Sequence, residues 1–266
     1  METERKALYN ALRQNWLRDP TLKVESWQVE NLRDIPLETL FDKIQEAGLP
    51  FDKETFHFLA NEHNTPEEMA DAILADLDLE QENYDKVYLA LFELWRRLVP
   101  EKQTLTIFCD ELDYQIHLYD VGEIKNFEAF QDSINDLLEI LNENVDSGVT
   151  PEKALKRVSE ETANNIEEFL YDYFSDEIDQ GHYSYVSDLV EGFYPYVADK
   201  RWFDLLKMRI QVENEGEDLD SAINGLQKKI KGNNLEFLFE LLTFLSKRGD
   251  SKTYYSVAKK ILSNLQ

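Results

Sequence analysis

The amino-acid sequence predicts an all-α protein, a multi-helix bundle that grades into stacked helical hairpins of the α-solenoid kind. The 266 residues include only nine glycines and seven prolines, fewer than average usage. Hydrophobic residues make up 42% of the chain and aromatic residues 12%, which is enough for a substantial core. Most segments place their apolar residues three or four positions apart, as helices do, so we expect about 12 to 13 helices.

Glycines and prolines mark where these helices end and begin. Seven glycines follow a stretch of helical apolar spacing, where a left-handed backbone ends a helix at no steric cost to glycine. They are Gly48, Gly122, Gly148, Gly181, Gly216, Gly232 and Gly249. Thr65-Pro66 and Thr150-Pro151 each offer a capping threonine followed by proline at the first helical position. We therefore predict helices near residues 3–18, 37–47, 52–63, 66–78, 80–98, 101–121, 125–146, 151–180, 182–197, 199–215, 217–231, 233–248 and 251–264.

Residues 21–36, TLKVESWQVENLRDIP, lack a regular helical period and alternate only in part. We interpret this segment as a connection with a short extended piece.

The last glycines are evenly spaced, at intervals of 33, 35 and 33 residues from Gly148 to Gly249. This period resembles that of tetratricopeptide repeats, in which helical hairpins stack on one another. The small-residue and Trp/Tyr pattern of that family is missing around Leu238 and Tyr254. The glycine spacing fits both a solenoid and an irregular bundle of helices of similar length. We divide the chain into an irregular helical region, 1–149, and a hairpin region, 150–266. These two regions can also form one continuous body.

The segment TIFCDELDYQIHLYD, residues 106–120, contains residue types that bind metals. Asp113 and His117 lie on one strip of the expected helix, and Glu54 and His57 have the Glu-x-x-His spacing of helical metal sites. The candidate ligands of a helical metal-dependent enzyme are Glu54, His57, Asp113 and His117. A di-iron carboxylate site needs two such motifs, and structural zinc needs more thiols. We prefer the alternative, in which Cys109 is a small core residue and Asp113 pairs with His117, and assign no metal or cofactor.

Other catalytic signatures are missing from the sequence. It has no glycine-rich phosphate loop, no dinucleotide-binding fingerprint and no Gly-x-Ser-x-Gly nucleophile elbow. Cys109 is flanked by Asp110 and Glu111, whose charges raise the pKa of its thiol and make it a poorer nucleophile. We therefore expect a protein that is not an enzyme.

A single cysteine excludes an intrachain disulfide, and the first residues have no apolar run typical of a signal peptide. No stretch approaches the roughly 18 consecutive apolar residues of a membrane-spanning helix. We expect a soluble, cytoplasmic protein that does not bind membranes.

The charge is large and uneven. The chain carries 28 basic and 54 acidic residues, a formal charge of −26. Residues 1–199 hold 16 basic and 45 acidic residues, whereas residues 200–266 hold 12 and 9. Residues 158–199 contain eleven acidic residues and no Lys or Arg. Direct nucleic-acid binding is not expected from such a surface, because phosphate contacts require clustered Lys and Arg.

Aromatic residues are interleaved with these acids. Tyr171, Tyr185 and Tyr196 fall outside the helical core spacing, so we expect them on the surface beside carboxylates. Tyrosine rings and carboxylates together suit a cationic partner. The predicted partner-binding residues are Tyr171, Asp172, Asp176, Glu177, Tyr185, Asp188 and Tyr196.

The function that the sequence favours is a non-enzymatic interaction protein, an adaptor, scaffold or chaperone-like chain that binds a basic segment of another protein. Three alternatives stay open: a nucleic-acid mimic that inhibits a basic nucleic-acid-binding protein, as immunity proteins do; the metal-dependent enzyme; and acids that only keep the protein soluble. The partner's identity and the oligomeric state are not determined by the sequence.

Overall fold

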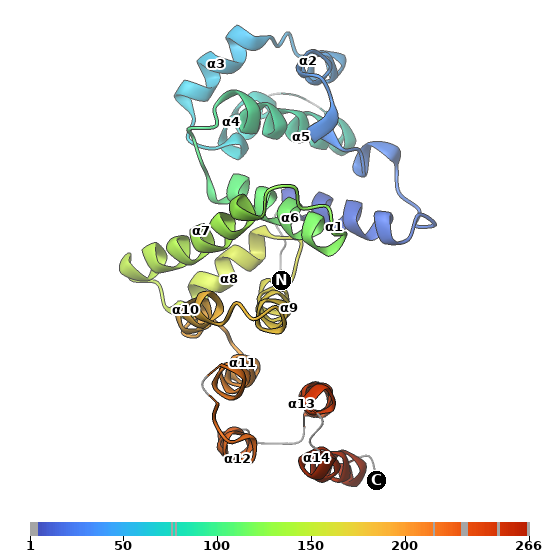
Figure 1. The fold of residues 1–266 in the computed structure, drawn as a ribbon. Coiled ribbons are helices and arrows are strands. Elements are labelled where there is room, and N and C mark those ends of the chain that lie inside the picture. Colours follow the sequence, from blue (N-terminus) through green and yellow to red (C-terminus); the bar gives the residue numbers. More distant parts are fainter. Residues whose placement is uncertain are drawn as a thin grey trace. The chain divides into compact units, whose positions relative to one another are not determined.

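The computed structural model describes residues 5–75, 77, 79–214, 216–229, 234–248 and 251–264. Within these residues the regular secondary structure consists of 14 α-helices and two short 3-10 helices (Figure 1). The all-α prediction is therefore confirmed. No helix in this part of the chain is long and apolar enough to cross a membrane.

The chain divides into two compact units. Unit 1 comprises residues 1–133 and 157–164, and unit 2 comprises residues 134–156 and 165–266. The dividing points fall within α7 (Phe127–Asp146) and α8 (Pro151–Glu161), and between α8 and the following helix.

Unit 1 is organised around one buried helix. Its helices are α1 (Arg5–Arg18), α2 (Leu37–Glu46), α3 (Lys53–Glu62), α4 (Pro66–Leu74), α5 (Gln81–Leu98) and α6 (Leu105–Asp120). Every residue of α5 from Val87 to Trp95 is buried, and α2 and α4 pack against this helix. Leu40 and Met69 are among the apolar side chains that α2 and α4 contribute to the core, each worth ~2 kcal/mol of burial.

The connection over residues 21–36 contains two 3-10 helices, η1 (Ser26–Gln28) and η2 (Leu32–Asp34), and no strand is described in it. Extended backbone conformations occur at Glu25 and Ile35, next to the two 3-10 helices. The Arg97 guanidinium of α5 donates hydrogen bonds of 2.6 to 2.7 Å to the carbonyl oxygens of Leu32, Arg33 and Ile35. These bonds satisfy carbonyls that a regular helix would satisfy itself, so the segment stays irregular and yet fixed.

The predicted helix over residues 151–180 is two helices, α8 and α9 (Ile166–Asp179). The Asn165 side chain caps α9 by accepting a hydrogen bond from the Glu168 N–H. The N–H groups of Ala163 and Asn164 donate to the carboxylate of Asp113, which lies on α6. Because these N–H groups have hydrogen-bond partners outside a helix, the helix can be interrupted here without leaving buried polar groups unsatisfied.

Several helices begin and end where the capping threonine, proline and glycine residues predicted. Thr65 caps α4 through the Glu68 N–H at 3.1 Å, with Pro66 at the first helical position. Gly48 and Gly181 have φ values of 89° and 85°, the left-handed conformation expected after a helix. Gly122, Gly148 and Gly216 share this conformation. The predicted ends at Gly232 and Gly249 lie outside the described residues.

Other boundaries differ from the prediction. α4 ends at Leu74 rather than residue 78, and α10 (Tyr183–Phe193) ends four residues before the predicted 197. α6 begins at Leu105 rather than 101, because the Thr104 side chain accepts a hydrogen bond from the Ile107 N–H and caps the helix there.

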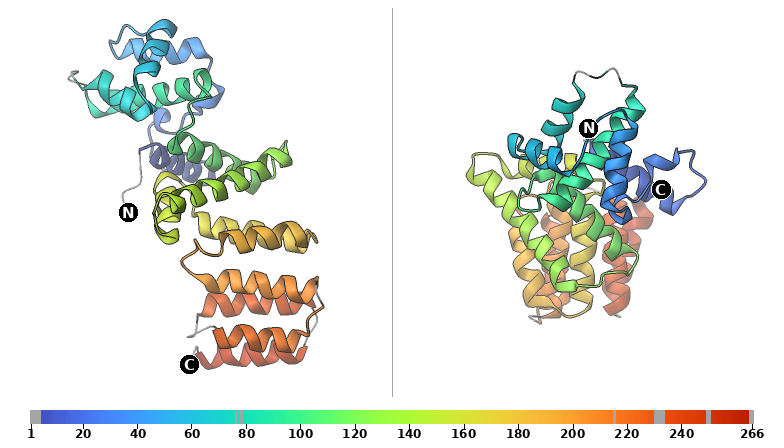
Figure 2. Two further views of the ribbon diagram at one scale, coloured as in Figure 1. Left: turned by 90° about the vertical axis from the view of Figure 1, so that its left-hand side faces the viewer. Right: turned by 90° about the horizontal axis from the view of Figure 1, so that it is seen from above.

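Unit 2 is a stack of helical hairpins. After α9 and α10 it contains α11 (Lys200–Glu213), α12 (Leu219–Lys229), α13 (Leu235–Arg248) and α14 (Ser251–Asn264). α9 contacts both α10 and α11, α10 also contacts α11, and α11–α12 and α13–α14 each pack as a pair. Figures 1 and 2 show these helices lying nearly parallel. Phe174 of α9 packs on Phe193 of α10 and Phe203 of α11, so aromatic rings join the first hairpin to the second.

Candidate functional site

The predicted partner-binding residues do not form one exposed surface. Tyr171, Glu177 and Tyr196 are buried, with 9%, 0% and 4% of their surfaces exposed, so the prediction that they face solvent is wrong. Glu177 bonds to Nδ1 of His182 at 2.8 Å, and the Tyr196 hydroxyl donates to Asn142 at 2.5 Å. Tyrosine rings are often buried while their hydroxyl groups form hydrogen bonds at the edge of the core. The apolar spacing along a single helix did not predict this burial.

The other four predicted residues are more accessible. Tyr185 is half-buried, with its hydroxyl 3.2 Å from that of Tyr173, and Asp172, Asp176 and Asp188 are exposed. Of the seven predicted residues, Tyr171 and Asp172 line a groove of unit 2.

This groove, which we call the acidic groove, lies among α9, α11 and α13 and has a volume of about 550 Å³. Its lining residues are Asn165, Glu167, Glu168, Tyr171, Asp172, Asp199, Trp202, Phe203, Glu236 and Glu240. α9, α11 and α13 are the first helices of three successive hairpins, which bring residues distant in the sequence to one face.

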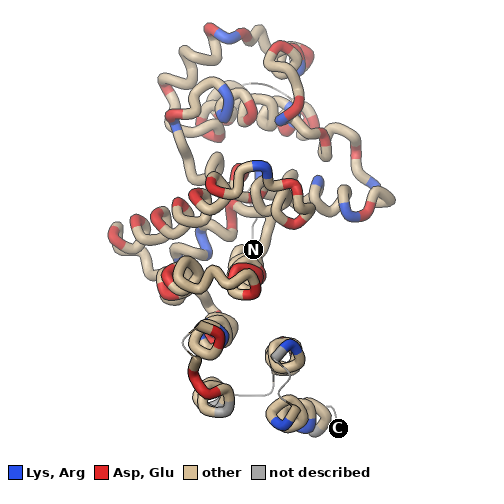
Figure 3. The backbone as a smooth tube through the Cα atoms, in the orientation of Figure 1, with Lys and Arg blue, Asp and Glu red and all other residues tan. Residues whose placement is uncertain are grey.

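Six carboxylates and no Lys or Arg line the acidic groove. Glu167 accepts the Ala198 N–H at 3.1 Å, and Asp199 caps α11 and pairs with Arg201. Glu236 and Glu240 have no ion pair with a basic side chain in the described part of unit 2. Figure 3 shows the acidic residues of α9 and the basic residues of α13 and α14. Among the described residues, the charges of Glu236 and Glu240 are therefore not neutralised by a basic side chain.

Aromatic rings lie between these carboxylates. The Tyr171 ring meets the Trp202 ring edge to face, with centroids 5.1 Å apart, and Trp202 in turn packs on Phe237 at 5.5 Å. Trp202 is only partly buried, so it presents indole surface to the groove. Such faces attract cations and pack against the alkyl stems of Lys and Arg.

The Tyr171 hydroxyl is buried and has no hydrogen-bond partner among the described residues. It lies near Glu240 and Ser175 without hydrogen-bond geometry to either. Burial raises the pKa of Tyr171, and the charge of Glu240 raises it further. The hydroxyl therefore stays neutral and can both donate and accept a hydrogen bond.

An ion-pair network fixes the helices around the acidic groove. Asp179, at the end of α9, pairs with Arg209 of α11 at 2.5 Å and with Lys247 of α13 at 2.6 Å. Arg209 is buried, and its guanidinium lies 5.7 Å from the centre of the Phe244 ring of α13. Asp179 thus links all three helices that line the groove.

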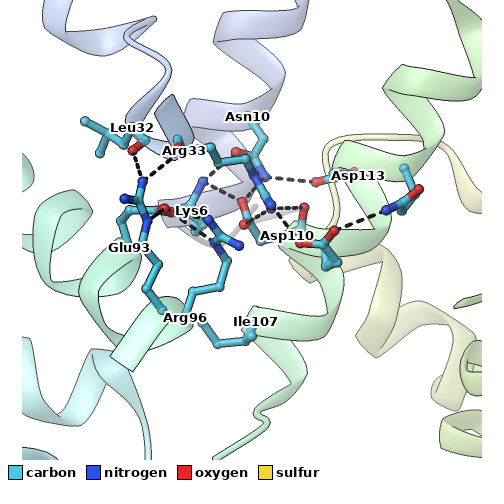
Figure 4. A network of polar contacts seen from close by, with 12 residues as sticks. Lys6, Asn10, Leu32, Arg33, Glu93, Arg96, Ile107, Asp110 and Asp113 are labelled. Carbon is cyan, nitrogen blue, oxygen red and sulfur yellow. Dashed lines mark hydrogen bonds and ion pairs between the residues drawn. The ribbon is translucent and has the colours of Figure 1, made fainter. Parts of the chain in front are cut away.

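A second polar cluster lies within unit 1, around Asp110 of α6 (Figure 4). Asp110 is 3% exposed and pairs with Lys6 at 2.6 Å and Arg33 at 2.5 Å. Although burial raises the pKa of Asp110, the two cations and the Asn10 amide outweigh it and lower the pKa to about 2. Arg33 comes from the irregular connection, so this cluster joins residues 21–36 to α1 and α6.

Asp113 is part of this cluster rather than of a metal site. Its carboxylate accepts hydrogen bonds from the Ala163 N–H at 2.8 Å, from the Asn164 N–H and side chain, and from Asn10 at 3.2 Å. Burial raises the pKa of Asp113 to about 6, although these hydrogen bonds oppose the rise. The predicted Asp113–His117 pair is wrong, because the carboxylate is directed to the 163–164 backbone instead.

The other predicted metal ligands are not gathered around Asp113. Glu54 is exposed, and the His57 ring lies 5.6 Å from that of Phe56. Among the described residues, no group of three or more His, Cys, Asp or Glu side chains is placed to hold a metal ion. Cys109 is fully buried, which confirms it as a small core residue, and burial together with Asp113 raises the pKa of its thiol.

Comparison with known proteins adds no family. The chain matches no protein-family model, and no curated protein or solved structure is significantly similar to it. Its function must therefore be argued from the two units themselves.

Trp202, Glu236 and Glu240 line the groove but were not among the residues predicted to bind a partner. A signal for them exists, since the contacting rings of Tyr171, Trp202 and Phe237 are 31 and 35 positions apart, close to the glycine period. Residues one period apart on the first helices of stacked hairpins lie side by side.

Proposed function

We propose that this protein is a non-enzymatic interaction protein whose acidic groove binds a basic segment of a partner protein. The observation that carries the proposal is the lining of the groove: six carboxylates, two aromatic side chains next to each other and no basic residue. Its volume of about 550 Å³ is within the range of binding pockets that receive side chains.

The chemistry of the lining favours cationic side chains. Carboxylates attract Lys and Arg over several ångströms and hold them by charge-assisted hydrogen bonds at contact. The Trp202 face can pack against an alkyl stem or a guanidinium. The formal charge of −26 adds long-range attraction, which raises the rate of encounter with a basic partner.

A merely solubilising role explains the acidic groove less well. Solubility requires carboxylates that are well hydrated and spread over the surface. Here Glu236 and Glu240 share a groove with Trp202 and with a buried tyrosine hydroxyl that has no partner among the described residues. That combination of apolar surface, charge and an unbonded polar group is typical of a binding site.

The test is fluorescence anisotropy with a labelled, unstructured peptide that alternates basic residues with Gly and Ser. We expect the wild-type protein to bind it, and the Glu236→Gln/Glu240→Gln variant to bind about tenfold more weakly, as expected for two lost contact charges. Glu38→Gln/Glu46→Gln is the matched control, because it removes two exposed charges of α2 in unit 1.

In about 150 mM salt, where exposed charges are screened beyond ~8 Å, the control variant should bind like the wild type. Equal weakening of both variants would mean that the peptide responds only to net charge. Absence of binding by the wild type would contradict the proposal outright.

A further inference from the structure

We propose that the acidic groove selects arginine over lysine, and that one guanidinium lies on Trp202 and donates hydrogen bonds to the Tyr171 hydroxyl and the Glu240 carboxylate. This inference rests on the proposed function and names the side chain that the groove recognises.

The Tyr171 hydroxyl has an unused capacity for hydrogen bonding. The residue lines the groove and is 9% exposed, yet its hydroxyl oxygen has no hydrogen-bond partner within the described residues. Buried hydroxyls are nearly always bonded, and one that is not calls for an explanation such as a ligand. The residue that carries this unbonded hydroxyl lines a groove that is large enough to admit a side chain.

The neighbours of the Tyr171 hydroxyl determine the kind of ligand that fits beside it. The carboxylate of Glu240 is close enough to raise the pKa of Tyr171, and Glu240 has no ion pair with a described basic residue. A ligand here meets the carboxylate oxygens of Glu240, which accept hydrogen bonds, and a hydroxyl oxygen that can also accept one. It must therefore bring several N–H donors and positive charge.

Arginine fits these acceptors better than lysine does. A guanidinium carries five N–H donors in one plane, so it can reach two acceptors at its edge while its face stacks on an indole. An ammonium group is compact and strongly hydrated, and it gains less from an aromatic face as it loses water. The Tyr171 hydroxyl beside an aromatic surface therefore favours the planar cation.

The chain contains the same contact geometry elsewhere. In unit 1 the Arg5 guanidinium lies 4.6 Å from the centre of the Tyr84 ring and 5.0 Å from that of Tyr88, with Asp85 at 3.5 Å. Arg33 lies 4.4 Å from the Tyr114 ring while it pairs with Asp110. These contacts show that an aromatic ring and a carboxylate can share one guanidinium in this protein. Lys207 of unit 2 likewise lies 3.7 Å from the Tyr194 ring and 2.9 Å from Glu191, so the preference for arginine rests on the Tyr171 hydroxyl as an additional acceptor.

The experiment uses three versions of the proposed-function peptide that differ only in their basic residues: all arginine, all lysine, or all trimethyl-lysine. For the full-length wild-type protein we expect the arginine peptide to bind about tenfold more tightly than the lysine peptide. In Tyr171→Phe the preference should fall to about twofold, mainly by loss of affinity for arginine.

Tyr255→Phe is the matched control, since this tyrosine of α14 is 65% exposed, and it should keep the wild-type preference. Thermal melting checks the fold. Tyr171→Phe removes an unbonded hydroxyl, so its Tm should equal or exceed that of the wild type.

Equal binding of the arginine and lysine peptides overturns the inference, and so does an unchanged preference in Tyr171→Phe. Tighter binding of trimethyl-lysine, which has no N–H donor, would identify an aromatic cage and also overturn it. In each case the proposed function survives if Glu236→Gln/Glu240→Gln still weakens binding. If the wild type binds no peptide, both the inference and the proposed function fail.

Discussion

At the scale of single residues, Asp110 and Asp113 show how position decides chemistry. Both are buried on α6, one helical turn apart, and burial raises the pKa of each. Lys6 and Arg33 reverse this for Asp110 and lower its pKa to about 2. Asp113 has hydrogen-bond donors but no ion pair in the described part of the chain, so burial keeps its pKa raised, at about 6.

These pKa values predict how stability depends on pH. Because the folded pKa of Asp113 is raised above its ordinary value of 3.8, its contribution to the free energy of unfolding is full below about pH 4 and is lost as the pH rises through about 6. Asp110 has a lowered pKa, so its contribution is present above about pH 4 and is lost as the pH falls through about 2.

Urea unfolding of the wild type and of Asp113→Asn between pH 4 and pH 7 measures the first effect. The wild type should lose stability relative to the variant over this range, by roughly 1 to 3 kcal/mol for a shift of about two pKa units. A stability difference that stays constant with pH would contradict the assignment.

Single residues also mark the limit of the sequence analysis. Tyr171 was predicted to contact a partner, and it does line the groove, but as a buried side chain rather than an exposed one. Glu177 was chosen for its charge, yet it is fully buried and bonded to His182. Replacing Glu177 would perturb folding because it would break this buried contact, so the accessible Glu236 and Glu240 are better positions to test the role of charge in binding.

At the scale of secondary-structure elements, the helices and most of their ends follow from local signals. The caps at Thr65 and Thr104 and the left-handed glycines lie within a few residues of the ends that they determine. The break between α8 and α9 depends on Asp113, some 50 positions away, and the irregular path of residues 21–36 depends on Arg97. Such distant partners leave no local pattern in the sequence.

The arrangement of α9, α11 and α13 depends on Asp179. Replacing Asp179 by Ala removes the carboxylate partner of the buried Arg209 guanidinium and leaves it a 3.4 Å hydrogen bond to the Ser175 carbonyl oxygen. We expect a loss of roughly 2 to 4 kcal/mol in the free energy of unfolding. Lys247→Ala is the control, because its side chain is 60% exposed and an exposed pair contributes ~0.5 kcal/mol.

Chemical denaturation of both variants makes the comparison. Asp179→Ala should also weaken binding of the basic peptide, since the walls of the acidic groove would no longer be fixed. Equal, small stability changes in the two variants would show that Asp179 does not hold these helices together.

At the scale of the whole molecule, the sequence predicted the amount of charge but not its location. The prediction concentrated on residues 158–199, which contain no Lys or Arg. The acidic groove also needs Glu236 and Glu240, which belong to the nearly neutral part of the chain, residues 200–266. Charge was counted along the sequence, whereas stacked hairpins assemble a surface from residues about one repeat apart.

The central claim is that the acidic groove of unit 2 receives a basic segment, and its most direct test is the location of the bound peptide. Backbone amide NMR spectra of the full-length protein, recorded during titration with the arginine peptide, report this residue by residue. We predict that the largest shift changes fall on α9 around Tyr171, the beginning of α11 around Trp202, and α13 around Glu240, with little change in α2 to α5. Changes centred on unit 1, or spread evenly over all acidic helices, would contradict the account.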